Sequence, residues 1–187
     1  MSLALHYVAN LLLILCLVTS IIQSRFLFKI QNYNLFSLSQ ISAIQFLSIL
    51  VSFFILIFLF ITSDFNFDLV YFHSHSEKPL IYKLSGVWGN HEGSMLLWIL
   101  ILVLFNFLFS LSKSSSQKFK EITVAVQSLM IFGFVLFLLL LSNPFNINNE
   151  NFNDGLGLNP ILQDPLLAIH PPILYIGYVC LLYTSDA

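Results

Sequence analysis

Four stretches of the chain are apolar and contain no Asp, Glu, Lys or Arg along their whole length: residues 3–24, 38–62, 95–111 and 122–141. A helix needs about 20 such residues to cross the roughly 30 Å hydrocarbon core of a bilayer. We therefore expect an all-α polytopic membrane protein with four complete transmembrane helices. A cleaved signal peptide is the competing interpretation of the first stretch, but Arg25 and Lys29 follow the apolar run, whereas a signal peptide carries its basic residues before it.

The polar segments between these stretches alternate in charge. Segment 25–37 holds two basic residues and no acid, and the segment just before residue 122 holds three lysines against one glutamate. Segment 64–94 is mildly acidic, and segment 143–170 holds three acids and no base. Because Lys and Arg near helix ends favour the inner side of a membrane, we expect the N-terminus outside and loops 64–94 and 143–170 on the periplasmic or intermembrane-space side.

The composition narrows the function classes. Hydrophobic residues make up 58% of the chain and charged residues 9%, against roughly 25% charged in soluble domains. A net charge of -2 with seven basic residues leaves no patch for a polyanion, so we expect no nucleic-acid binding. The uncharged spans do not support an ion-coupled transporter, because such proteins usually carry ionisable residues within the membrane. Cys16 and Cys180 form neither CxxC nor CxxCH, which argues against a disulfide framework and a covalent haem site.

The most informative polar residue is His170, in the stretch NPILQDPLLAIHPPILYIGYV at residues 159–179. Proline is tolerated at the first position of a helix, so Pro171 and Pro172 predict a helix N-terminus with His170 at its cap. The positive end of the helix dipole disfavours an imidazolium and keeps a ring lone pair available for a metal such as haem iron. A helix-cap histidine hydrogen-bonded to its own loop is the competing interpretation. Nine residues lead from Pro171 to Val179, about 13 Å of helix, so we expect only the start of a fifth helix.

A second candidate is the sequence WGNHEGSMLLW at residues 88–98. Tryptophans at the start of a membrane helix usually act as interface anchors, and Glu92 complements the positive end of the helix. Gly89 and Gly93 allow the backbone to approach a cofactor or another helix closely. His91 is a candidate metal or haem ligand. The alternative is that the whole motif only anchors and caps the start of the helix.

The other histidines have simpler interpretations. His73 and His75 are expected in a solvated loop, and His6 at the membrane interface. The sequence contains no nucleotide-binding glycine loop, catalytic triad pattern or His/Cys metal cluster.

Three motifs follow one another along the chain: VWGNHEGSMLLW from Val87, SNPF from Ser142 and LNPILQDPLLAIHPPILYIGYV from Leu158. From about Val70 to Val179 they resemble the N-terminal part of the CcmF family of cytochrome c haem lyases, and the first two helices agree in hydropathy. The resemblance implies a subunit of the System I maturation machinery in the bacterial inner (plasma) membrane or the mitochondrial inner membrane. Such a subunit accepts haem from the chaperone CcmE and helps attach it to the CxxCH thiols of apocytochrome c.

The resemblance also implies a role for one residue. The histidine of the family's HPP motif is one of two outward-facing histidines proposed to ligate the incoming haem, and His170 occupies that position. The second outward histidine, a tryptophan-rich motif and two transmembrane histidines that hold a resident haem b would lie beyond Val179. We therefore expect this chain to be inactive alone. The resemblance assigns no role to six residues of the first motif: Trp88, Gly89, His91, Glu92, Gly93 and Ser94.

The chain is expected to divide into two parts. Residues 1–179 form the N-terminal transmembrane part of a haem lyase. Residues 180–187, CLLYTSDA, resemble a translated sequencing adapter and are expected to be a non-native tail, with a natural C-terminus as the alternative. Two other function classes remain open, a non-catalytic membrane scaffold that docks partners without binding haem, and a transporter or respiratory-chain membrane subunit.

Overall fold

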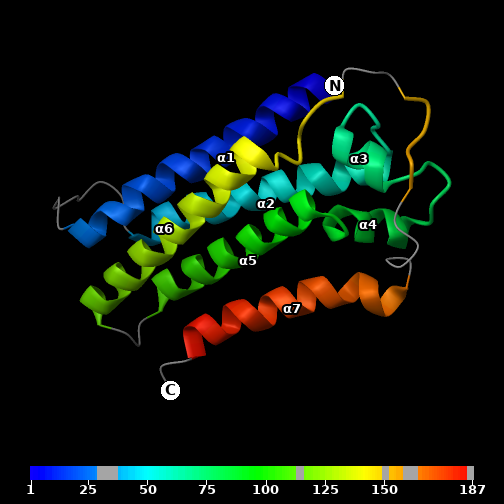
Figure 1. The fold of residues 1–187 in the computed structure, drawn as a ribbon. Coiled ribbons are helices and arrows are strands. Elements are labelled where there is room, and N and C mark those ends of the chain that lie inside the picture. The colour runs from blue at the N-terminus through cyan, green and yellow to red at the C-terminus, as the bar shows by residue number, and fades with distance from the viewer. Residues whose placement is uncertain (29–37, 113–115, 149–151, 158–163, 185–187) are drawn as a thin grey trace.

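The computed structural model describes residues 1–28, 38–112, 116–148, 152–157 and 164–184. Figure 1 shows the helices of these ranges: α1 (Ser2–Ser24), η1 (Arg25–Phe28), α2 (Leu38–Thr62), α3 (Asp68–His73), α4 (Leu80–Trp88), α5 (His91–Leu111), α6 (Gln117–Leu141) and α7 (Pro165–Thr184). Within the described ranges, pairing of the extended type is limited to one isolated bridge between Phe67 and Ile147. The all-α prediction is confirmed.

Helices α1, α2, α5 and α6 are long and apolar enough to cross a membrane, which confirms the four predicted spans. The bounds of α2 match the apolar pattern, whereas α5 and α6 begin earlier than that pattern indicates. Their first turns are polar and capped, because Asn90 and Ser116 accept from the backbone N–H groups of Gly93 and Phe119. Segment 64–94 is more ordered than a loop, since it contains α3 and α4.

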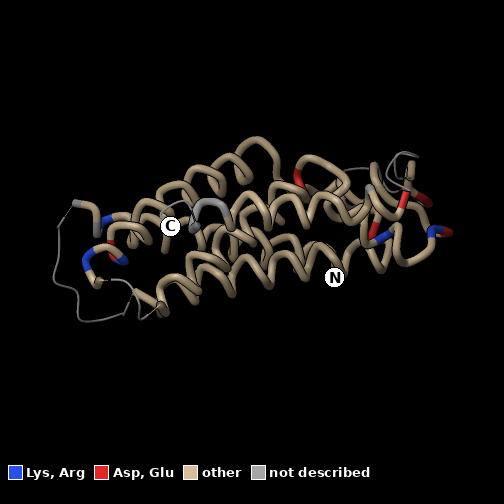
Figure 2. Tube along the Cα trace, turned by 90° about the horizontal axis from the view of Figure 1, so that it is seen from below, with Lys and Arg blue, Asp and Glu red and all other residues tan. Residues whose placement is uncertain are grey.

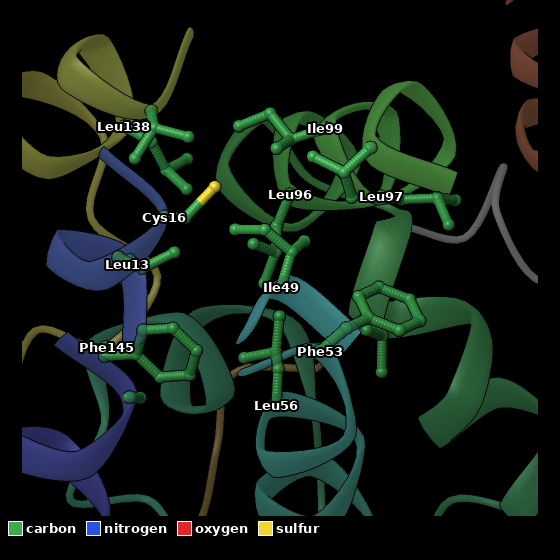
Figure 3. Close-up of a cluster of buried hydrophobic side chains, with 14 of the residues drawn as sticks. Leu13, Cys16, Ile49, Phe53, Leu56, Leu96, Leu97, Ile99, Leu138 and Phe145 are labelled. Carbon is green, nitrogen blue, oxygen red and sulfur yellow. The ribbon is translucent and has the colours of Figure 1, made fainter. Parts of the chain in front are cut away.

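The four long helices form a bundle, and α7 lies outside it (Figure 1). Helix α1 packs against α2 and α6, and α5 completes the bundle by packing against the same two helices. Helix α7 contacts α5 and α4. Figure 3 shows the core between these helices, where Leu13, Cys16, Ile49, Leu96 and Leu138 are fully buried. Because lipid tails are as apolar as these side chains, close packing is what favours the bundle inside a membrane.

A set of neutral polar side chains, which we call the polar belt, joins all four long helices: Gln23, Ser42, Gln45, Asn106 and Ser128. All five are fully buried. Gln23 Nε2 donates to Ser42 Oγ (2.8 Å), and Ser128 Oγ donates to Gln23 Oε1 (2.7 Å). Asn106 Nδ2 donates to Gln45 Oε1 (3.2 Å). Hydrogen bonds between membrane helices contribute about 0.6 kcal/mol each on average, so the belt adds modest stability and specific alignment.

Charged residues lie toward the two ends of the bundle (Figure 2). At one end, Arg25 begins η1, which follows α1 and contacts α6, and Lys118 and Lys120 lie in the first turn of α6. The N-terminus lies at the opposite, mainly acidic end, where Ser2 Oγ donates to Asp64 Oδ2 (2.8 Å). This arrangement puts segment 64–94 and the described residues between α6 and α7 at one end with the N-terminus, and α7 runs back from there along the bundle (Figure 1). Which side of a membrane that end faces stays a prediction. Three charged residues of the sequence pattern lie outside the described residues: Lys29, Lys113 and Glu150.

Helix α7 begins at Pro165, so the helix start predicted from Pro171 and Pro172 is wrong. Asp164 caps the helix, because its Oδ1 accepts from the backbone N–H of Leu166 (2.8 Å). An aspartate followed by proline combines a favoured N-cap residue with a favoured first helical residue. This earlier signal determines the start, and both later prolines lie inside the helix.

The corrected start moves His170 into the second turn of α7, away from the cap. The helix has 20 residues, about 30 Å, instead of the nine predicted. It includes residues 180–184, and residues 185–187 lie outside the described residues. The expectation that 180–187 is a non-native tail stays a prediction.

Candidate functional site: a pocket between the α4–α5 turn and α7

The turn between α4 and α5 is tight because the side chain of Asn90 forms hydrogen bonds with the backbone of both helices. Its Oδ1 accepts from the backbone N–H of Gly93 (2.6 Å), and its Nδ2 donates to the backbone oxygen of Gly86 (2.7 Å). A Cβ atom on Gly93 would lie 1.7 Å from the backbone oxygen of Val87. Glycine is therefore required there for the close approach of the two helices.

Trp88, the last residue of α4, ties this turn to α7. Its Nε1–H donates to the backbone oxygen of Ala168 over 2.7 Å. In an uninterrupted helix that oxygen would accept from the N–H of residue 172, but Pro172 has none. The indole therefore satisfies a carbonyl that the proline leaves without a helical donor.

Aromatic contacts extend the junction between α5 and α7 along the bundle. The ring of Trp98 meets that of Tyr175 edge-on, with centroids 5.3 Å apart and planes at 90°. Tyr178 lies one turn further along α7, with its centroid 6.3 Å from that of Trp98. Edge-to-face aromatic pairs of this kind contribute about 0.5–1.5 kcal/mol beyond burial. Trp98 therefore packs between helices, a role that the interface-anchor interpretation did not include.

His91, the first residue of α5, is linked to the end of α6. Its Nδ1 lies 2.9 Å from Oγ of Ser142, the C-cap of α6, and its ring lies edge-on to Phe137 with centroids 6.0 Å apart. This hydrogen bond occupies one ring nitrogen. The other, Nε2, has no hydrogen-bond partner in the part of the chain that the structure describes.

The rest of the SNPF motif reaches α1. Asn143 Nδ2 donates to Asn10 Oδ1 (2.7 Å), and the backbone oxygen of Phe145 lies 2.6 Å from Nδ1 of His6. Phe145 itself is fully buried in the core. The motif is thus a junction between the end of α6 and the first turns of α1, and it gives His6 a structural partner.

A pocket of about 320 Å³ lies between the α4–α5 turn and α7. Its walls include five residues that the sequence singled out: Trp88, Gly89, His91, Ser94 and Pro171. Sequence analysis missed four others: Ser85, Asn90, Ala168 and Tyr175. Once α7 is known to be helical at Pro171, helical spacing puts Tyr175 on the same face. Four singled-out residues do not line it: Glu92, Gly93, His170 and Pro172.

His170 directly precedes Pro171, which lines the pocket, and its side chain is exposed. The imidazole has no hydrogen-bond partner among the described residues. Among those residues, no group of three or more His, Cys, Asp or Glu is placed to hold a metal ion. A single free imidazole next to an aromatic pocket fits one axial ligand of a haem better than a cage for a bare ion.

The segment around His73 and His75 has its own partner in residues 152–157. His73 ends α3, and its Nδ1 lies 3.1 Å from the backbone oxygen of Leu69. His75 pairs with Asp154 at 3.3 Å, and Ser76 donates to Asp154 from its hydroxyl (2.7 Å) and its backbone N–H (3.0 Å). Chiefly the Ser76 hydroxyl bond, followed by its backbone bond, lowers the pKa of Asp154 to about 2. His75 therefore helps to hold a loop connection, whereas His73 bonds within α3.

The fold and the site together define a multi-pass helical membrane protein with a ligand-sized pocket at one end of its bundle. The family model described as "Cytochrome C assembly protein" matches residues 88–185, just over half of the chain, and this match begins at Trp88 and includes both motifs of the pocket. The chain belongs to this family.

Similar proteins carry names from cytochrome c biogenesis. The chain is 46% identical to "Cytochrome c-type biogenesis protein ccl1" of Rhodobacter capsulatus over 72% of this chain and 21% of that protein. It is 44% identical to "Cytochrome c-type biogenesis protein CycK" of Bradyrhizobium diazoefficiens over 93% of this chain and 26% of that protein. The Escherichia coli "Cytochrome c-type biogenesis protein CcmF" is 38% identical over 72% of this chain and 21% of that protein. The chain thus spans about a fifth to a quarter of these relatives' length.

A solved structure gives the same architecture. "Cytochrome c Heme Lyase CcmF" matches with a TM-score of 0.73 over 95% of this chain and 28% of that chain. The sequence identity is 24%, so this likeness shows the fold alone.

Proposed function

We propose that this chain is the N-terminal membrane part of a cytochrome c haem lyase and that His170 ligates haem iron. The observation that carries the proposal is the exposed His170, which has no hydrogen-bond partner among the described residues and directly precedes Pro171 in the lining of a pocket built from two separate motifs. The bond from Trp88 to Ala168 holds these motifs together. Membership of the cytochrome c assembly family supports the same function.

The residues around His170 favour capture of a flat aromatic ligand. An imidazole with no internal hydrogen bond presents its ring nitrogen without breaking a contact. Trp88 and Tyr175 provide aromatic side chains in the pocket. Pro171, which directly follows His170, stiffens the backbone between His170 and Tyr175. Haem, when bound, supplies the iron that His170 ligates and the group that is attached to apocytochrome c.

The proposal includes a location and partners. Haem b is received from the chaperone CcmE and passed to apocytochrome c, with other System I maturation subunits and membrane lipid as neighbours. The N-terminus and the loops at 64–94 and 143–170 face the periplasm or intermembrane space of a bacterial or mitochondrial inner membrane. The basic residues at the other end of the bundle support this orientation. The chain spans about a fifth of the length of these relatives. We therefore assign the complete attachment of haem to apocytochrome c to a larger assembly that includes this chain.

The test is capture of haem from the loaded chaperone. The 187-residue chain in detergent micelles, mixed with haem-loaded CcmE, should acquire haem with a Soret band, and His170→Ala should reduce the amount by about tenfold or more. The matched control is His73→Ala, which removes an imidazole outside the pocket and should leave capture unchanged. Equal capture by His170→Ala and the unchanged chain would overturn the ligand assignment. A scaffold that docks partners without binding haem would then be the better explanation.

A further inference from the structure

The pocket is lined by the imidazole of His91, which the proposed ligation by His170 does not use. Its Nδ1 is held by Ser142, which fixes the ring between α5 and the end of α6. Its Nε2 has no hydrogen-bond partner among the residues that the structure describes. A histidine bonded through one nitrogen in this way is oriented, and its other nitrogen is available to a ligand.

Most other polar groups that line the pocket are already bonded within the protein. Trp88 Nε1 donates to Ala168, and Asn90 Nδ2 donates to Gly86. The hydroxyls of Ser85 and Ser94 donate to the backbone oxygens of Tyr82 and His91. Among the side-chain polar groups of the described lining residues, this leaves His91 Nε2 and the hydroxyl of Tyr175 for a bound molecule.

The chemistry of these free groups selects an acidic ligand. The lining residues include no Asp or Glu, so no carboxylate of the pocket repels an anion. An imidazole N–H and a phenol O–H both donate to a carboxylate, and hydrogen bonds to an ionised acceptor are about twice as strong as neutral ones. The remaining walls include Trp88, Pro171 and the ring of Tyr175, which suit the flat apolar body of an aromatic molecule.

The size of the pocket limits how much of a ligand it holds. Ligand pockets usually measure about 300–1,000 Å³, so 320 Å³ is near the lower limit and suits part of a large molecule. His170 lies outside the lining but directly before Pro171, which belongs to it. Successive side chains of a helix point about 100° apart, so a ligand bound to His170 by its centre reaches the pocket only by extending one edge around the side of α7.

We infer that this pocket binds the carboxylate-bearing edge of the tetrapyrrole, with His91 Nε2 donating to the carboxylate. The inference rests on the proposed function for the identity of the ligand and adds a positioning residue to it. His170 holds the iron, and His91 determines how the ring is turned about that bond. Ser142 acts through His91, because it fixes the imidazole from the opposite nitrogen.

The experiment compares ligands that differ only at the carboxylates. Ferric protoporphyrin IX and its dimethyl ester are titrated into the 187-residue chain in detergent micelles, with Soret absorbance as the readout. The unchanged chain should bind the free acid about tenfold more tightly than the ester, as expected for loss of one charge-assisted hydrogen bond. His91→Phe should remove this preference while the Soret shift that depends on His170 remains. His91→Gln retains an N–H donor and should keep part of the preference.

Two controls make every outcome decisive. His73→Phe replaces a histidine outside the pocket and should leave the preference unchanged, and near-ultraviolet circular dichroism verifies the fold of each variant. Metal-free protoporphyrin IX and its ester, followed by fluorescence quenching, test the carboxylate contact without iron. A preference for the acid that survives His91→Phe overturns the inference and leaves the ligation by His170 standing. A preference lost in His91→Phe with no Soret shift dependent on His170 overturns the ligation and leaves the carboxylate contact standing.

Discussion

The indole of Trp88 donates to the one carbonyl, that of Ala168, which Pro172 leaves without a partner inside α7. Eighty residues separate the donor from the acceptor. The proline and the tryptophan therefore depend on each other, since the first removes a helical hydrogen bond and the second replaces it from another helix. This bond sets the spacing of the pocket walls.

A double-mutant cycle tests this dependence. Trp88→Phe keeps an aromatic ring but removes the N–H, which leaves the carbonyl of buried Ala168 unpaired and should cost about 1–3 kcal/mol. Pro172→Ala restores a helical donor for the same carbonyl, so the cost of Trp88→Phe should be smaller in that background. The measurement is the free energy of unfolding in detergent by chemical denaturation. Equal costs in the two backgrounds would contradict the coupling.

Gly93→Ala should be severely destabilising. Its new Cβ would meet the backbone oxygen of Val87 at 1.7 Å, a contact that only backbone movement can relieve. We expect a loss of more than about 3 kcal/mol, or failure to accumulate as a folded protein. Gly133→Ala on α6 is the matched control, because nothing lies within 4 Å of the position of its Cβ, and it should be neutral or slightly stabilising. Similar thermal midpoints for the two variants would refute this account of the turn.

The connection between residues 152–157 and the segment after α3 should open in acid. The pKa of Asp154 is lowered to about 2, against about 3.9 in an unfolded chain, so the stability from this carboxylate is present above about pH 4. It is lost as the pH falls from there toward 2, when the carboxylate takes up a proton. The backbone N–H of Leu156 donates to the backbone oxygen of Tyr71, so its protection against hydrogen exchange, relative to an unfolded peptide at the same pH, should fall over this range.

The matched variant for this acid transition is Asp154→Asn. It removes the charge and keeps a polar side chain of similar size, so exchange at Leu156 should be faster than in the unchanged chain at pH 6. It should also show no further step between pH 4 and 2. A step that persists in Asp154→Asn would assign the transition to another group.

The sequence predicted the helices far better than it predicted their contacts. Long uncharged runs identify membrane helices because burying a charge in lipid is costly, and that constraint is local to each run. The start of α7 was mispredicted because two adjacent prolines outweighed the pair formed by Asp164 and Pro165, although both patterns are helix-start signals. No local rule decides between the two patterns. Pro172 is tolerated inside the helix because Trp88, from another helix, donates to the Ala168 carbonyl that the proline leaves without a helical donor.

The candidate site was predicted in its residues and not in its geometry. His91 and Trp88 were visible as a motif, but the partner of each, Ser142 and Ala168, lies 51 and 80 residues away. Such pairings arise from how α4, α5, α6 and α7 pack together. The pairing of His75 with Asp154 could not be predicted for the same reason, since Asp154 is 79 residues further along the chain.

The polar belt has a consequence for the opposite end of the molecule. Asn106 and His91 both belong to α5, about 22 Å apart along the helix axis. Sliding α5 by a single residue, about 1.5 Å, would pull Asn106 away from Gln45 and break their hydrogen bond. The buried hydrogen bond between Asn106 and Gln45 thus fixes the position of α5 along its own axis. It thereby also fixes the position of the His91 imidazole at the other end of α5.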